Sequence, residues 1–155
     1  MKIVPIKEIP NNATNIPDDI NQVYNTCLEL TNLCKSLGGT GIAAVQVGIP
    51  WKLFVIKMGK KYRCFANCMY FPKDSLKVQS QEGCLSIVDE NGDLIYYNVE
   101  RSRNVIVKGK EIKLKNNKPF LESIELDLTI PDAVTFQHEI DHQRYVLISD
   151  IGTKL

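Results

Sequence analysis

The stretch IPDAVTFQHEIDHQRYVLI, residues 130–148, contains the only two histidines of the chain and decides how we expect the rest to pack. His138 and His142 stand four positions apart, with Glu139 directly after the first. Residues at i and i+4 lie on one face of an α-helix, a single turn apart. A helix in this stretch therefore points both imidazoles in the same direction.

The histidine spacing favours a metal site over a chance pair of surface histidines. Apolar residues on both sides, AVTF before and YVLI after, indicate that the helix is buried, and buried imidazoles need polar partners. In the pattern H-E-x-x-H, two histidines are metal ligands and the glutamate is placed to reach a water on the metal as a general base. The alternative is a helix that happens to carry two exposed histidines. We predict that His138 and His142 bind a metal and that Glu139 is the base.

A catalytic metal site of this type commonly has three protein ligands and an open position for water. The chain has no further histidine, and the only acid after His142 is Asp150. The third ligand is therefore expected upstream. Cys84 in SQEGCLS follows a predicted strand and a glycine, which makes it the best-placed thiolate. By itself, the position of Cys84 is only weak support for a metal ligand, because free cysteines usually pack as small apolar side chains.

Composition and charge narrow the class of protein. A chain of 155 residues is expected to form one domain, 1–155. Its 19 Lys+Arg and 18 Asp+Glu leave a net charge of +1, which gives no electrostatic basis for binding nucleic acid or an anionic membrane. The apolar runs are too short to span a bilayer. A signal peptide needs an unbroken apolar stretch, whereas the N-terminal MKIVPIKEIP contains prolines and charged residues. We expect a cytoplasmic protein.

The cysteines are five, an odd number, and accompany no secretory signal. We therefore expect reduced thiols and no disulfide framework. Cys27 and Cys34 fall on the apolar face of a predicted helix and are expected to be buried there. Cys64 and Cys68 are expected to be thiols in and beside a strand.

Two helices with many short strands between them predict an α+β fold. In PDDINQVYNTCLELTNLCKSLGG, residues 17–39, apolar side chains step by three and four, as on one face of an amphipathic helix. Thr129 near the N-cap and Pro131 in the first turn suit the start of the C-terminal helix. Strands are expected at residues 51–58, 61–68, 75–81, 93–100, 104–109, 111–115 and 120–128. We expect antiparallel β-sheets packed around the central C-terminal helix that carries HEIDH, with the amphipathic helix N-terminal to them.

Three segments in this order resemble the peptide deformylase family. The family is marked by G-Φ-G-Φ-A-A-x-Q, E-G-C-Φ-S and Q-H-E-x-D-H. This chain has GTGIAAVQ, EGCLS and QHEIDH at residues 39–46, 82–86 and 137–142. VERSRNV, residues 99–105, is similar to the strand that follows the cysteine motif in the family. Inside the motifs only Thr40 departs, because the family usually has an apolar residue there, and the resemblance covers nearly the whole chain.

Further departures lie outside the metal ligands and the base. DENGDLIYY, which ends at Tyr97, is longer than the family's loop over the substrate channel, so the structure of residues 89–97 is not predicted. Asn67-Cys68 stands where the family often has Asn-Pro, and QRY follows His142 where the family usually has L-x-G. The chain resembles a short form of the family, with little C-terminal extension.

The resemblance implies a metal-dependent hydrolase that removes the N-formyl group from the N-terminal formyl-methionine of newly synthesised polypeptides and releases formate. Cys84, His138 and His142 would bind one divalent metal, which lowers the pKa of a bound water toward neutrality. Glu139 would take the proton of that water as hydroxide attacks the formyl carbon, and then deliver it to the leaving amine.

The resemblance also implies roles for the surrounding residues. The Gln46 side-chain amide and the Leu85 backbone N–H would donate to the oxyanion. The substrate-binding residues would be Gly39, Thr40, Gly41, Ile42, Glu82, Gly83, Val134 and Thr135. For the residues of the methionine pocket, the alternative is core packing. Asp141 is expected to pair with Arg101, either to orient the metal site together with Glu82 or as a structural ion pair without catalytic effect.

A thiolate with two imidazoles suits Zn²⁺, Fe²⁺, Co²⁺ and Ni²⁺, and the resemblance favours Fe²⁺ in the cell, with Zn²⁺, Ni²⁺ or Co²⁺ in purified protein. The implied partners are N-formyl-methionyl nascent polypeptides, including those at the ribosome. We expect a monomer without a nucleic-acid or membrane partner. Two other functions stay open: a small H-E-x-x-H metallopeptidase that cuts ordinary peptide bonds, and a non-catalytic homologue that binds metal or formyl-peptides.

Overall fold

The strands form two antiparallel sheets. They are β1 (Gly41–Ala43), β2 (Leu53–Met58), β3 (Lys61–Pro72), β4 (Lys77–Glu82), β5 (Tyr97–Ser102), β6 (Val105–Lys115), β7 (Lys118–Leu128) and β8 (Thr153–Lys154). The computed structural model describes residues 1–155 and orders the larger sheet β1-β2-β3-β6-β7 and the smaller sheet β4-β5-β8. Because β1 and β4 each end a sheet, each has one edge without a strand partner.

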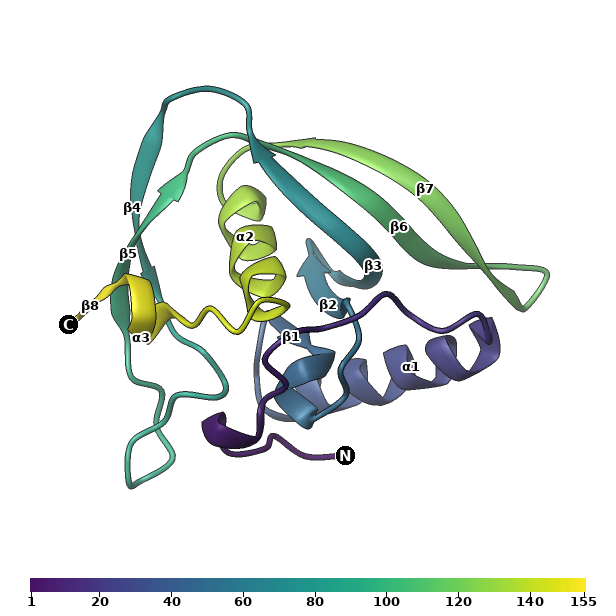
Figure 1. The fold of residues 1–155 in the computed structure, drawn as a ribbon, viewed down its shortest axis with the longest axis horizontal. Coiled ribbons are helices and arrows are strands. Elements are labelled where there is room, and N and C mark those ends of the chain that lie inside the picture. Colours follow the sequence, from purple (N-terminus) through teal and green to yellow (C-terminus); the bar gives the residue numbers. More distant parts are fainter.

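The helices are α1 (Ile20–Ser36), α2 (Asp132–His142) and α3 (Ile148–Ile151), with short 3₁₀ turns η1 (Ile6–Glu8) and η2 (Ala44–Val47). Helix α2 stands in the centre, between the β4–β5 sheet and strands of the larger sheet (Figure 1). The predicted α+β fold, with antiparallel sheets around the C-terminal helix, is confirmed. No helix has both the length and the apolar character needed to cross a membrane.

Helix α1 forms where the apolar periodicity predicts it. The Asp19 side chain accepts hydrogen bonds from the backbone N–H groups of Asn21 and Gln22, which caps the helix start. Its buried residues are Val23, Cys27, Leu30 and Cys34, one turn after another along one face. They pack in a core cluster with β2 and β3. The helix thus covers the larger sheet on the side away from α2 (Figure 1).

Strand β6 is continuous, where the sequence predicted two strands, 104–109 and 111–115, with a break at Lys110 directly after Gly109. The register of β3 against β6 shifts between Ala66 and Met69, so β3 bulges there. A Cβ on Gly109 would lie 2.5 Å from Cys68 Sγ. Gly109 is therefore the residue that accommodates the bulge of the neighbouring strand, and it does not break its own strand.

Strand β5 begins at Tyr97, four residues later than predicted. The Asp89 carboxylate accepts hydrogen bonds from the backbone N–H groups of Asn91 and Asp93, and Gly92 has a φ of +83°. These contacts form a turn, and a bridge between Val88 and Leu94 closes it. The apolar residues before Tyr97 therefore belong to a hairpin-like loop, which ends beside the C-terminal strand β8 (Figure 1).

The C-terminal helix is shorter than the apolar pattern suggests. Helix α2 ends at His142, and Tyr145 has a positive φ of 61° that reverses the chain before α3 begins. The Tyr145 hydroxyl donates to the Ile6 carbonyl at 2.9 Å. The residues after His142 thus pack against the N-terminal segment instead of continuing the helix.

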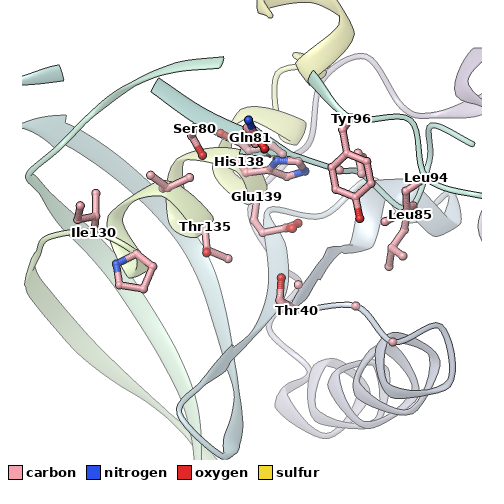
Figure 2. Close-up of a pocket in the computed structure, with 18 of the residues that line it drawn as sticks. Thr40, Ser80, Gln81, Leu85, Leu94, Tyr96, Ile130, Thr135, His138 and Glu139 are labelled. Atoms are coloured by element: carbon pink, nitrogen blue, oxygen red, sulfur yellow. Dashed lines mark hydrogen bonds and ion pairs between the residues drawn. The ribbon is translucent and has the colours of Figure 1, made fainter. Parts of the chain in front are cut away.

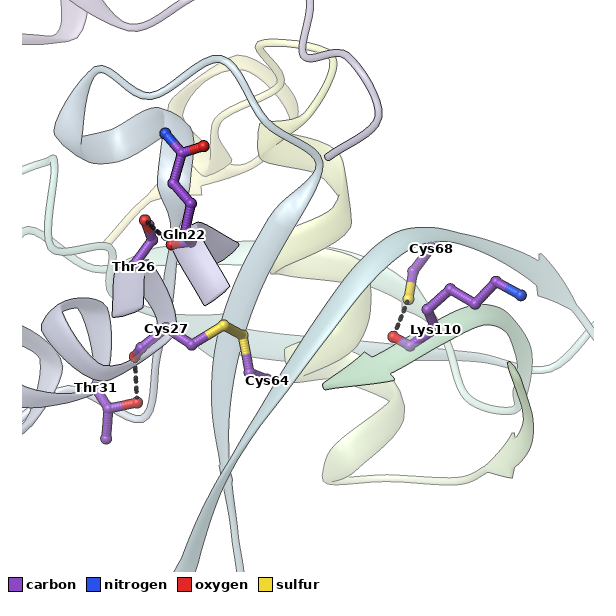
Figure 3. Close-up of a disulfide and its surroundings, with 7 residues drawn as sticks. All are labelled: Gln22, Thr26, Cys27, Thr31, Cys64, Cys68 and Lys110. Carbon is purple, nitrogen blue, oxygen red and sulfur yellow. Dashed lines mark hydrogen bonds between the residues drawn. A yellow bond between two sulfur atoms is a disulfide. The ribbon is translucent and has the colours of Figure 1, made fainter. Parts of the chain in front are cut away.

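One expectation about the cysteines is wrong. Cys27 on α1 is joined to Cys64 on β3 by a disulfide (Figure 3). Their Cα atoms are 6.2 Å apart, within the usual range for a disulfide. The two cysteines are 37 residues apart in sequence, and only the packing of α1 on β3 brings them together. Their spacing in the sequence therefore does not predict the bond. Cys34, Cys68 and Cys84 are free and buried.

Candidate metal centre and active site

Three side chains from two segments meet at the centre of the molecule. Cys84 follows β4, and His138 and His142 lie on successive turns of α2. Their ligand atoms all lie within 4.8 Å of one another, and Cys84 Sγ is 3.6 Å from His142 Nε2. All three residues are buried. One sulfur and two imidazole nitrogens in this arrangement could hold a divalent transition metal.

Hydrogen bonds decide which nitrogen each imidazole can offer to a metal. His138 Nδ1 lies 2.8 Å from Glu82 Oε1, which leaves Nε2 available. His142 turns Nε2 toward the thiol of Cys84, while its buried Nδ1 has no hydrogen-bond partner. The two histidines are thus oriented by different means, one by a carboxylate and the other by the packing around it.

A buried ionic network stands behind His138. Arg101 on β5 donates through Nε and Nη2 to the two carboxylate oxygens of Glu82, at 2.9 and 2.8 Å. Its remaining Nη1 donates to Asp141 Oδ2 at 2.7 Å. The three side chains are 3% to 7% exposed, so water scarcely screens the network. Asp141 pairs with Arg101 as expected, and through Glu82 the pair connects to the imidazole of His138.

Burial and neighbouring charges shift the pKa values of Glu82 and of both histidines. Burial would raise the pKa of Glu82, but hydrogen bonds from Arg101 and with His138 outweigh it and lower that pKa to about 2. Burial likewise disfavours the charged form of His138, yet hydrogen bonds with Cys84 and Glu82 raise its pKa to about 10. Burial and the charge of His138 lower the pKa of His142. The Glu82 carboxylate thus stabilises positive charge on His138, whereas positive charge on His142 is disfavoured.

Glu139 lies beside the ligands without joining them. Its Oε2 atom is buried and has no hydrogen-bond partner. A Cβ on Gly41 would lie 2.8 Å from Glu139 Oε1, so the glycine lets β1 approach the carboxylate. Burial raises the pKa of Glu139 to about 7. A carboxyl group with such a pKa can both accept and return a proton near neutral pH.

Two further groups are placed to donate hydrogen bonds near the ligands. Gln46 Oε1 accepts from the Ala43 N–H at 2.9 Å, which turns the amide nitrogen toward Cys84 and Ser86. The Leu85 N–H, next to the cysteine, donates to no protein group. Gln46 and Leu85 are the two residues to which the family resemblance gives the role of oxyanion donors; the Gln46 amide nitrogen faces Cys84, and Leu85 is the next residue along the chain.

A cleft of about 490 Å³ runs between β1 and β4 past His138 and Glu139 (Figure 2). Of the predicted substrate-binding residues, its wall includes Gly39, Thr40, Gly41, Glu82, Gly83, Val134 and Thr135. Ile42 is the exception, because it is fully buried in the cluster under α1. Successive side chains of a strand point to opposite faces, so Ile42 turns away from the cleft that Gly41 lines. The prediction that Ile42 lines the pocket is wrong.

Sequence reasoning missed other residues of the cleft wall. Ser80 on β4 is one of them. The alternation of side chains along a strand could have predicted it, because Ser80 lies two residues before Glu82 and shares its face of β4. Leu94 and Tyr96 come from the loop before β5 (Figure 2). A Cβ on Gly83 would lie 3.0 Å from Leu94 Cδ1 and 3.2 Å from Tyr96 Cε1, so both side chains approach this glycine. No local pattern in the sequence indicates that this loop folds back over the glycine.

Comparison with known proteins gives a consistent result. The family model described as polypeptide deformylase matches residues 3–154. A peptide deformylase from Syntrophomonas wolfei is 30% identical over 149 residues, which cover 96% of this chain and 83% of that protein. The resemblance to the family is therefore confirmed.

Solved structures agree with the sequence comparison. The crystal structure of peptide deformylase from Thermotoga maritima is similar with a TM-score of 0.83 and 27% identity, covering 97% of this chain and 95% of the other. A peptide deformylase from Synechococcus elongatus in complex with actinonin is similar with a TM-score of 0.81 and 27% identity, covering 97% and 78%.

Proposed function

This chain belongs to the polypeptide deformylase family of hydrolases, and we propose that it removes the N-formyl group from the formyl-methionine at the start of newly synthesised polypeptides. The observation that carries the proposal is the position of Glu139. Its unpartnered carboxylate oxygen lies beside a Cys-His-His group, in the wall of an open cleft. A base and a ligand set in one buried place supply what amide hydrolysis at a metal requires.

Cys84, His138 and His142 would hold one divalent cation, with Fe²⁺ as the metal in the cell and Zn²⁺, Co²⁺ or Ni²⁺ as substitutes in purified protein. When bound, the cation lowers the pKa of a coordinated water and so supplies the nucleophile at neutral pH. Glu139 would act as the general base that takes a proton from the attacking water, and as the acid that returns it to the amine leaving the formyl carbon. The pKa of Glu139, raised to about 7, supports both transfers.

The Gln46 amide and the Leu85 N–H would stabilise the oxyanion that forms at the formyl carbon. Ala43 holds the oxygen of the Gln46 amide, so the nitrogen already faces the cluster and little reorganisation is needed. The Leu85 N–H donates to no protein acceptor, so it would break no hydrogen bond in order to bind the oxyanion. Both donors are therefore available where negative charge develops.

The substrate peptide would bind in extended form between β1 and β4. Each of these strands has one edge without a strand partner, and residues of both line the cleft. An added strand could use their free backbone groups. Val134 and Thr135 on α2 are then placed to contact the first side chain of the peptide. We propose that residues 1–155 act as one monomeric catalytic domain in the cytoplasm, on nascent chains including those at the ribosome.

The test measures formate release from formyl-Met-Ala-Ser by protein purified without oxygen, together with its metal content. Acetyl-Met-Ala-Ser is the matched control, since it differs by one methyl group, and its hydrolysis is followed by the free amino group that it releases. We expect turnover of the formyl peptide with about one metal per chain, and little turnover of the acetyl peptide. Comparable cleavage of the acetyl peptide would favour a general peptidase. Metal binding without any formate release would favour a non-catalytic homologue.

A further inference from the structure

Tyr70 on β3 makes a hydrogen bond that the proposed reaction does not use. Its hydroxyl donates to Asp141 Oδ1 at 2.8 Å. The Tyr70 ring packs against the larger apolar cluster, and Asp141 is 4% exposed. Burial, together with the charge of Asp141, raises the pKa of Tyr70 to about 12, so the hydroxyl remains a donor. A tyrosine among the apolar residues of a strand gave no signal of this contact in the sequence.

The contact is the outer end of a continuous chain of buried hydrogen bonds. The other oxygen of Asp141 accepts from Arg101 at 2.7 Å. The opposite edge of the Arg101 guanidinium holds Glu82 through two bonds. Glu82 in turn lies 2.8 Å from His138 Nδ1. Four consecutive contacts thus connect the hydroxyl of Tyr70 on the larger sheet to an imidazole on α2, by way of the smaller sheet.

We propose that Tyr70 is a positioning residue that fixes the orientation of the metal-binding imidazole of His138 through Asp141, Arg101 and Glu82. This inference rests on the metal site of the proposed function. Without the hydroxyl, Oδ1 of Asp141 keeps only Arg144, whose Nη2 is 3.8 Å away on a side chain that is 70% exposed.

The physical reason is that each member of the chain has little freedom while both of its sides are held. A carboxylate bonded at both oxygens presents a fixed edge to a planar guanidinium, which then presents a fixed edge to the next carboxylate. Loss of the outermost donor lets Asp141 rotate, and this rotation loosens Arg101 and then Glu82. Partners of this kind behind a metal ligand typically change metal affinity by about 10- to 100-fold. Because Tyr70 acts through three intermediates, we expect the lower end of that range.

The test compares Tyr70→Phe with Tyr145→Phe. Both remove one hydroxyl and one hydrogen bond of similar length, but the Tyr145 bond goes to the Ile6 carbonyl outside the chain of contacts. Protein loaded with Zn²⁺ is mixed with excess chelator, and the rate of Zn²⁺ release is measured. We expect Tyr70→Phe to release Zn²⁺ about 10-fold faster than wild type and Tyr145→Phe to match wild type. Release from Tyr70→Phe at the wild-type rate overturns the proposal.

A double mutant separates positioning from general destabilisation. In a Glu82→Gln background, the route from Tyr70 to His138 is already broken, so Tyr70→Phe should accelerate release no further. Additive effects would mean that Tyr70 acts by another route. Thermal unfolding of the metal-free proteins shows whether the hydroxyl merely stabilises the fold, in which case stability falls and the release rate does not change. If Tyr70→Phe does not fold, Asp141→Asn tests the same contact and should also release Zn²⁺ faster.

A missing metal site and a missing role for Tyr70 give different results in this experiment. If the wild-type protein binds no Zn²⁺, the metal site itself is wrong. If wild type binds Zn²⁺ and Tyr70→Phe releases it at the same rate, only the role of Tyr70 is wrong.

Discussion

Helices α1 and α2 both pack against the larger sheet, but they bury different kinds of side chain. The buried face of α1 consists of Val23, Leu30 and two cysteines. The buried residues of α2 include Gln137, His138, Glu139, Asp141 and His142, alongside only three apolar ones. Apolar contacts have no preferred direction, so the α1 face needs only a surface of fitting shape. Each polar group of α2 needs a partner at a defined distance and angle.

The partners of α2 come from segments far away in the sequence. Ser102 on β5 exchanges two hydrogen bonds with the Gln137 amide. Glu82 holds His138, and Arg101 holds Asp141. Burial of α2 therefore depends on the smaller sheet being in place, whereas α1 is held on the larger sheet by apolar contacts and by the Cys27–Cys64 disulfide. We expect changes on α1 to affect stability and changes around α2 to affect metal binding and turnover.

The largest expected effect is the loss of metal and turnover when one of two buried cysteines, Cys84 but not Cys34, is replaced. Cys84→Ala removes a proposed ligand, so the protein should lose its metal and, with it, formate release. Cys34→Ala, on the apolar face of α1, should keep one metal per chain and near wild-type turnover. Metal content and formate release measured on both proteins check this. Full metal content in Cys84→Ala would show that the third ligand lies elsewhere.

Glu139→Ala should separate metal binding from catalysis. Glu139 is adjacent to the ligands but is not one of them, so the variant should keep its metal. Loss of a general base typically lowers turnover by about 100- to 10,000-fold. The measurements are kcat for formyl-Met-Ala-Ser and metal content. Turnover within a few-fold of wild type would exclude Glu139 from the mechanism.

Leu30→Ala tests the apolar helix. Leu30 is fully buried between α1 and the larger sheet. Truncation of such a leucine leaves a cavity and typically costs about 2–5 kcal/mol of unfolding free energy. Denaturant unfolding should show this loss, while the rate of formate release per folded molecule stays near wild type. A change in kcat as large as the change in stability would mean that α1 does not act only as a scaffold.

Asp19→Ala should have the smallest effect. The Asp19 carboxylate caps α1 by accepting from the N–H groups of Asn21 and Gln22. Loss of a helix cap typically costs about 1 kcal/mol. Thermal unfolding should detect it, with metal content and turnover unchanged. An undiminished melting temperature would indicate that water replaces the cap without loss.

Prediction from the sequence succeeded where a feature is local. The step of three and four in α1 and the i, i+4 histidines of α2 are properties of short segments, and the helices occur at those places. It failed where a feature depends on a neighbour. The bulge of β3 packs on Gly109, and β6 continues past this glycine as one strand instead of the two predicted. The turn at Asp89 delayed the start of β5. Alternation along β1 turned Ile42 into the core.

The cysteines show the same division. Periodicity along α1 was sufficient to predict that Cys27 is buried. That it is bonded to Cys64 depends on how α1 crosses β3, which no spacing in the sequence reveals. Because the sequence shows no secretory signal, we predicted that all five cysteines are reduced. That prediction is wrong for Cys27 and Cys64, which the fold brings together.

By itself, the sequence determined the residue types and their order: two histidines one helical turn apart, a glutamate beside them, and an upstream cysteine after a glycine. Only the tertiary structure decided which imidazole nitrogen is available, how Arg101 joins Glu82 to Asp141, and that Tyr70 closes the chain of contacts. The physical reason is the range of the forces. Helix periodicity arises from backbone bonds between neighbours, whereas buried polar groups take whichever partners the packed sheets bring within hydrogen-bond distance.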